Sequence, residues 1–124
     1  MQNPIGIFDS GIGGLTVANA IRQVLPQENL IYFGDTAHMP YGDKSAEAIK
    51  YYSLKIGKFL QDEGCKAIVI ACNTASAKAL RNIQQLDLPH LDPSKRVLGV
   101  IRPTTEVLGH FSTSQQIGIM GTLG

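Results

Sequence analysis

The chain has 124 residues, of which 44% are hydrophobic and 17% charged, as is typical of a soluble globular domain that buries a core. Its 11 Lys and Arg residues balance 10 Asp and Glu residues, so no strong field would attract nucleic acid or anionic lipid. The longest apolar stretch, residues 67–72, is too short to span a bilayer, and the N-terminus shows no secretory signal pattern. We therefore expect a cytoplasmic protein that binds neither nucleic acid nor membrane.

Strand-like and helical segments alternate along the chain. The expected strands cover residues 5–8, 30–33, 67–71, 97–101 and 116–120. The expected helices cover residues 15–24, 46–63, 74–85 and 103–111, with Ser45 capping the start of the second helix and Gly64 its end. This alternation predicts an α/β fold, namely an open, flavodoxin-like parallel sheet of about five strands with helices on both faces.

The last expected strand is followed only by residues 121–124. A doubly wound sheet would continue there with a loop and a covering helix. The sequence therefore predicts an unfinished sheet that belongs to a larger protein.

The two cysteines, Cys65 and Cys72, lie on either side of the third expected strand. Seven extended residues separate their Cα atoms by roughly 23 Å, whereas a disulfide requires a separation below about 7 Å. We therefore expect no disulfide between them. The sequence also lacks CxxC or clustered His and Cys spacing, so we expect no structural metal.

Polar residues follow the ends of the expected strands, where open α/β sheets bind their ligands. They are Asp9-Ser10, Asp35-Thr36, Cys72-Asn73-Thr74, Arg102 and Thr122. Backbone N–H groups and helix starts at such points suit an anionic ligand. The sequence therefore places a candidate site at this edge of the sheet.

The Gly-rich turn after the first strand does not fit a dinucleotide site. A GxGxxG motif beginning at Gly11 requires glycine at position 16, which is Thr16. Asp9 either caps this turn or handles a proton from the top of a central strand.

Cys72 has two possible roles. A cysteine in an apolar strand is often an inert core residue, but a helix is expected to begin just after Cys72, and a helix start stabilises a thiolate. The residues alone leave both roles open.

The long loop over residues 34–44 has two interpretations as well. Loops of this length often face a substrate, although Pro40-Tyr41-Gly42 could form only a turn. His38 in this loop is either a lid residue or a solvated side chain, and we expect the latter.

Several of these segments together resemble the glutamate racemases of the aspartate/glutamate racemase family. The segments that carry the resemblance are Phe8-Asp9-Ser10-Gly11-Ile12-Gly13-Gly14-Leu15, Tyr32-Phe33-Gly34-Asp35-Thr36-Ala37-His38, Pro40-Tyr41-Gly42 and Ala71-Cys72-Asn73-Thr74-Ala75-Ser76. Weaker matches are Gly99-Val100-Ile101 with Pro103, and Gly121-Thr122.

The resemblance implies an isomerase without a cofactor that interconverts L- and D-glutamate and supplies D-glutamate for peptidoglycan. Two cysteines would act on opposite faces of the α-carbon. Cys72 would be the base or acid on one face, assisted by Asp9. The substrate's amino and carboxylate groups would be bound by Asp9, Ser10, Pro40, Tyr41, Gly42, Cys72, Asn73, Thr74 and Thr122, with Tyr41 and Gly42 acting through their backbone.

Members of this family are about twice as long as this chain, and their second cysteine lies in the half that is missing here. Residues 1–124 would thus form the N-terminal catalytic domain of a two-domain enzyme, inactive alone, whose partners are glutamate and further copies of itself in a homo-oligomer. Arg102 departs from the family pattern, so its role stays open. Two alternatives remain: an aspartate or hydantoin racemase of the same family, and a non-catalytic module that self-associates through the face left exposed.

Overall fold

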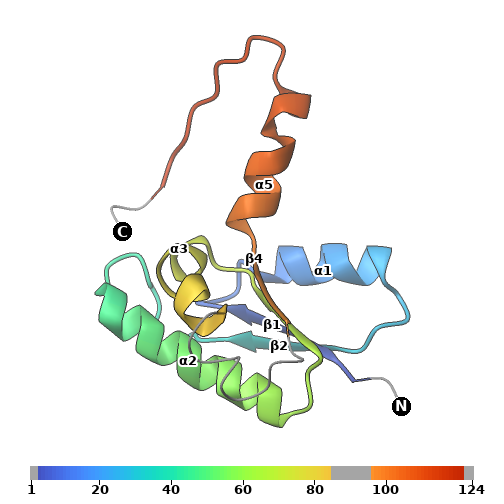
Figure 1. Ribbon diagram of the computed structural model, residues 1–124, viewed down its shortest axis with the longest axis vertical. Helices are drawn as coiled ribbons and strands as arrows, with labels where there is room; N and C mark the ends of the chain where they lie inside the picture. The colour runs from blue at the N-terminus through green and yellow to red at the C-terminus, as the bar shows by residue number, and fades with distance from the viewer. Residues whose placement is uncertain (1–2, 85–95, 122–124) are drawn as a thin grey trace.

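The computed structural model describes residues 3–84 and 96–121 and has a four-stranded parallel sheet at its centre (Figure 1). In chain order its strands are β1 Ile5–Asp9, β2 Leu30–Gly34, β3 Ala67–Ile70 and β4 Arg96–Gly99. Their spatial order is β2-β1-β3-β4, and every neighbouring pair is parallel. The predicted parallel α/β architecture is therefore confirmed.

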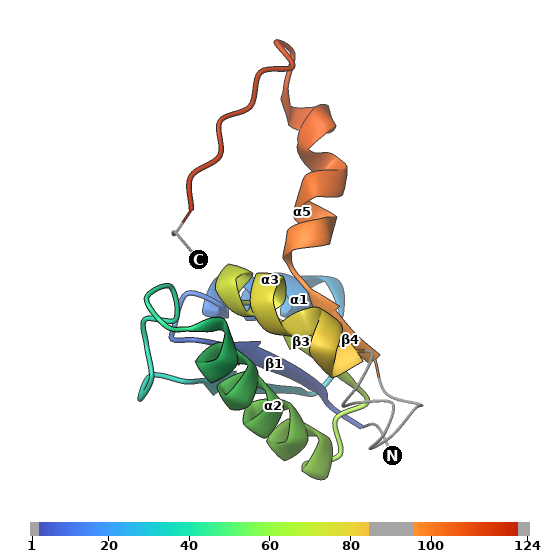
Figure 2. The same cartoon turned by 60° about the vertical axis from the view of Figure 1, so that its left-hand side comes forward.

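Helices cover both faces of this sheet (Figures 1 and 2). They are α1 Leu15–Val24, α2 Ala46–Asp62 and α3 Asn73–Asn82; a further helix, α5 Ile101–Val107, follows β4 and is continued by the 3₁₀ helix η2 Leu108–Phe111. The chain moves one way across the sheet from β1 to β2 and the opposite way from β2 through β3 to β4. Because such crossovers are right-handed, α1 lies on one face, and α2 and α3 lie together on the other.

The core lies between the central strands and the pair α2 and α3. In β3, Ile68 and Ile70 are buried while the alternate residues are only half-buried, which is the period of a strand covered more fully on one face. On α2, the buried residues Ile49, Ile56 and Leu60 follow the helical spacing that the sequence predicts.

Both predicted caps of α2 are present. The Ser45 hydroxyl accepts a hydrogen bond from the Ala48 N–H at 3.1 Å, which satisfies one of the free donors of the first turn. Gly64, just after the helix, has φ +85°, a left-handed conformation that favours glycine.

The predicted strand over residues 116–120 is wrong: these residues are exposed and form no strand. Figure 1 shows α5 rising away from the sheet, followed by an extended segment. Apolar residues at alternate positions, Ile117 and Ile119, suggest a strand, but a strand forms only when a neighbour supplies hydrogen bonds, and this segment does not pair with β4. The loop expected over residues 87–95 lies outside the described residues.

Cys65 and Cys72 flank β3 at its opposite ends, and neither forms a disulfide, as the sequence predicts. No helix among residues 3–84 and 96–121 is both long and apolar enough to cross a bilayer.

Gly64→Ala and Gly57→Ala should change stability in opposite directions. Alanine at Gly64 must adopt a left-handed conformation, so the free energy of unfolding should fall by about 1 kcal/mol. At Gly57, inside α2, an added Cβ meets no atom within 4 Å, so the higher helix propensity of alanine should raise stability by about 0.5–1 kcal/mol. Urea denaturation measures both, and a loss of stability at both positions would contradict this account.

Candidate functional site

An open cavity of about 560 Å³ lies at the carboxyl ends of the central strands. Five of the predicted site residues line it: Asp9, Ser10, Cys72, Asn73 and Thr74. The rest of the lining is Gly13, Gly14, Thr16, Val17, Ala71, Val100, Thr104 and Gly121. Segments far apart in the sequence meet here because parallel strands end at one edge of the sheet.

Asp9, the last residue of β1, holds the Gly-rich turn in place. Its carboxylate is buried and accepts hydrogen bonds at Oδ2 from the Gly14 N–H at 2.7 Å and from the Tyr32 hydroxyl at 3.1 Å. A Cβ on Gly14 would lie 2.8 Å from the Asp9 Cβ, so only glycine lets the turn fold back this closely. The turn-capping role considered for Asp9 is thus present, on a carboxylate that also lines the cavity.

Tyr32 joins the neighbouring strand β2 to this turn. Its hydroxyl lies 3.0 Å from the Gly11 carbonyl as well as 3.1 Å from Asp9 Oδ2, so its single proton is shared between two acceptors. Burial raises the pKa of Tyr32 to about 12, helped by the charge of Asp9 and the hydrogen bond to it. Tyr32 is absent from the site predicted from the sequence, although it lies within the Tyr32-to-His38 segment and pairs with Ile7 of β1.

Cys72 is the N-cap residue of α3 and reaches the cavity from the end of β3. Its thiol lies 3.5 Å from the Ser10 hydroxyl, and Sγ accepts a hydrogen bond from the Ala75 N–H at 3.4 Å. This N–H and the positive end of α3 stabilise negative charge on the sulfur. Cys72 is 7% exposed. It belongs to the buried core and also lines the cavity, so its two possible roles are not exclusive.

The loop residues Pro40, Tyr41 and Gly42 do not line this cavity. The Tyr41 side chain is buried, its ring lies 6.1 Å from that of Phe8, and its hydroxyl donates to Asp35 Oδ2 at 2.5 Å. Burial, and next the hydrogen bond to Asp35, raise the pKa of Tyr41. The structure thus places Tyr41 in the core, where it shares one hydrophobic cluster with Cys72.

His38 is solvated as expected, with 45% of its side chain exposed, but it also has partners within the protein. Its ring stacks on Tyr52 at 4.0 Å between centroids, and its Nδ1 lies 2.8 Å from Asp35 Oδ1. Tyr52 comes from α2, and a local reading of the loop sequence could not include this contact.

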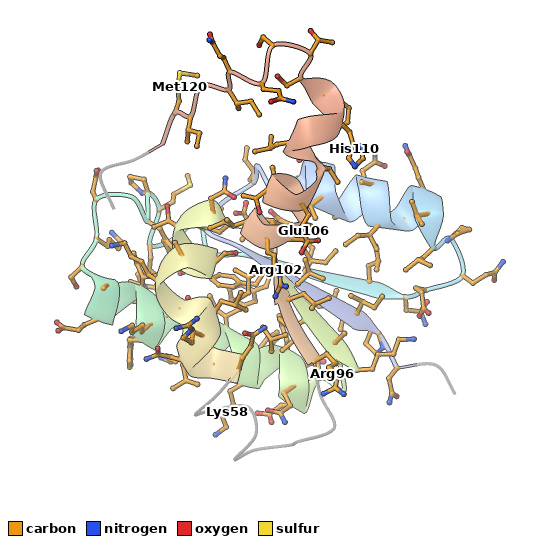
Figure 3. All side chains as sticks on the ribbon, turned by 45° about the horizontal axis from the view of Figure 1, so that its top comes forward. Lys58, Arg96, Arg102, Glu106, His110 and Met120 are labelled. Carbon is orange, nitrogen blue, oxygen red and sulfur yellow. The ribbon has the colours of Figure 1, made fainter. Side chains whose placement is uncertain are left out.

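Arg102 and Thr122 complete the predicted set. Arg102 lies on α5, is 89% exposed, and its Nε pairs with Glu106 Oε1 at 3.0 Å on the same helix (Figure 3). It does not line the cavity, whereas Thr104 of the same helix does. Thr122 lies outside the described residues, and its neighbour Gly121 lines the cavity.

Similar proteins are found among curated sequences, although no family model matches the chain. The chain is 50% identical over 121 residues to the glutamate racemase of Geobacter metallireducens and 49% identical over 122 residues to that of Corynebacterium diphtheriae. These alignments cover 97% and 98% of this chain but 42% and 43% of the relatives. The chain thus spans less than half the length of the curated relatives that it matches.

Solved structures agree with this result. The glutamate racemase of Aquifex pyrophilus superposes with a TM-score of 0.87 at 44% identity, over 97% of this chain and 45% of that one. The glutamate racemase of Francisella tularensis in complex with D-glutamate gives a TM-score of 0.78 at 43% identity, over 86% of this chain and 39% of that one. The resemblance to glutamate racemases is therefore confirmed over nearly the whole chain, and its extent is consistent with an N-terminal half.

Gly14→Ala should displace the Asp9 carboxylate and destabilise the fold. The added Cβ would lie 2.8 and 2.9 Å from the Asp9 Cβ and Cγ and 3.0 Å from the Ala71 Cβ, an overpacking that costs about 1–3 kcal/mol. Gly13→Ala is the matched control because its added Cβ meets nothing within 4 Å, so its effect should stay within about 0.5 kcal/mol. If urea denaturation showed the same loss of unfolding free energy for both variants, the close contact with Asp9 would not explain why position 14 needs glycine.

Tyr32→Phe should change the pH dependence of stability in alkaline solution. The tyrosine ionises near pH 10 when the chain is unfolded and near pH 12 when it is folded. The folded state therefore binds more protons in this interval, and the contribution of Tyr32 is complete below pH 10 and lost as the pH rises through 12. Urea denaturation at several pH values between 10 and 12 should show that the free energy of unfolding declines less steeply for the variant than for the wild type. Parallel curves of unfolding free energy against pH would contradict the raised pKa.

Proposed function

We propose that this chain, which is similar to glutamate racemases over nearly its whole length, transfers the α-proton of glutamate through Cys72. The observation that carries the proposal is the position of the Cys72 sulfur, which lies 3.5 Å from the Ser10 hydroxyl and 3.4 Å from the Ala75 N–H beside an open cavity. A thiolate held there can remove a proton, and the Ser10 hydroxyl can turn to donate to it.

The charges around the cavity suit an amino acid. The Asp9 carboxylate matches the substrate's ammonium group, and its bond to the Gly14 N–H keeps it in place. The hydroxyl of Ser10, just after β1, and the side chains of Asn73 and Thr74, at the start of α3, suit the α-carboxylate. Donors aimed at this carboxylate would also stabilise the negative charge that develops when the α-proton leaves. Tyr41 belongs to the same buried cluster as Cys72, and its packing there would help to hold the cysteine in position.

Racemisation requires a second proton-transfer group on the opposite face of the α-carbon. Cys65 cannot supply it, because it is buried at the other end of β3. The matched relatives are more than twice as long as this chain, and we infer that the second thiol belongs to the remaining part of such a protein. With two thiols no cofactor is needed, and the D-glutamate formed would serve peptidoglycan synthesis. The cytoplasmic location and the homo-oligomer stay predictions.

Solvent exchange at the α-carbon tests the role of Cys72 in the chain as it stands. In D₂O, proton NMR should show loss of the α-proton signal from one enantiomer of glutamate and little inversion, because one thiol reaches one face. Cys72→Ser should slow this exchange by at least about 100-fold. Cys65→Ser, the same change at the other end of β3, should retain it if its circular dichroism matches that of the wild type.

Three outcomes would contradict the proposal. Equal exchange in Cys72→Ser and the wild type would remove the thiol from the reaction, and no exchange with either enantiomer would show that the cavity does not activate glutamate. Inversion by this chain at ordinary enzymatic rates, about 10 s⁻¹, would show that no further segment is required. Faster exchange with aspartate than with glutamate would instead favour the aspartate racemase alternative.

A further inference from the structure

A second cavity, of about 490 Å³, lies between the carboxyl end of β2, the loop that follows it and residues 51–59 of α2. None of its lining residues also lines the Cys72 cavity. Its volume falls in the range of small-molecule sites, which is about 300–1,000 Å³. The function proposed for Cys72 makes no use of this cavity.

Aromatic rings form most of its wall. Phe33 meets Phe59 edge-on at 5.5 Å, and His38 stacks on Tyr52 at 4.0 Å. Tyr51, next to Tyr52 on α2, is 59% exposed, and Phe59 is 45% exposed. Rings that are fixed by their neighbours yet still exposed offer flat apolar surfaces on which another ring can stack at little entropic cost.

A cation lies among these rings. The Lys55 ammonium is 5.4 Å from the centroid of the Tyr51 ring, a cation–π distance that holds the flexible side chain over the cavity. Among the residues that the structure describes, the one carboxylate in the lining is that of Asp35, which already interacts with the Tyr41 hydroxyl and with His38 Nδ1. The Asp35 carboxylate is thus turned toward donors of the protein itself, and the Lys55 ammonium is the lining group that can pair with an anionic ligand.

We propose that this cavity binds a small planar anion, namely a single aromatic ring that carries a carboxylate. The ring would lie against Tyr51, Tyr52 and Phe59, and the carboxylate would pair with the Lys55 ammonium. This inference does not depend on the function of Cys72.

NMR titration of the ¹⁵N-labelled chain with 3-phenylpropionate tests the proposal. Saturable shifts should map to α2 and to the end of β2. Two related compounds separate the contributions: 3-phenylpropan-1-ol keeps the ring without the charge, hexanoate keeps the charge without the ring, and each should bind at least about tenfold more weakly.

Matched variants on α2 locate the two contacts. Lys55→Gln should weaken binding of 3-phenylpropionate at least about tenfold, whereas Lys58→Gln makes the same charge change outside the lining and should leave it unchanged. Tyr51→Ala should weaken binding, and Leu54→Ala, an exposed apolar residue of the same helix outside the lining, should not.

Absence of saturable shifts at millimolar concentration would overturn the proposal. So would equal affinity for the alcohol, equal losses in Lys55→Gln and Lys58→Gln, or shifts confined to the Cys72 cavity.

Discussion

The hydrogen bond from the Gly14 N–H to the Asp9 carboxylate, 2.7 Å long, is the interaction on which the candidate site depends. A buried carboxylate is costly without such partners, and satisfying it forces the turn after β1 to fold back onto the strand end. That fold places Ser10 beside Cys72 and starts α1 at Leu15. The Tyr32 hydroxyl, from β2, donates a hydrogen bond to the same carboxylate. One acidic side chain thus contacts both the turn before α1 and the neighbouring strand β2.

Much of the fold could be predicted because its signals are local. The bounds of α1, the Ser45 cap and the Gly64 terminator each depend on residues within one or two turns of a helix. The strand predicted over residues 116–120 failed because pairing depends on where a neighbouring edge lies, and sequence alternation alone does not report that position. The start of α3 was placed one residue late, since the sulfur of Cys72 serves as its cap acceptor.

The residues of the candidate site also fall into two groups, those that local sequence predicts and those that depend on tertiary contacts. Asp9, Ser10, Cys72, Asn73 and Thr74 could be placed together because they follow strand ends, and parallel strands end at a common edge. Tyr32 could not be placed there, since its hydroxyl reaches Asp9 from the adjacent strand. The direction of the Tyr41 side chain, into the core and away from the cavity, depends on Asp35 and on packing against Phe8. Such contacts are decided by tertiary structure.

The Asp35 carboxylate has a consequence for how the two cavities relate. It forms part of the wall of the aromatic cavity, and it also receives the hydroxyl of Tyr41, whose ring belongs to the same buried cluster as Cys72. Protein interiors are close-packed, so displaced atoms push on their neighbours. A ligand that displaced the Asp35 side chain would therefore disturb its hydrogen bond to Tyr41, and through Tyr41 the packing of the cluster that contains Cys72.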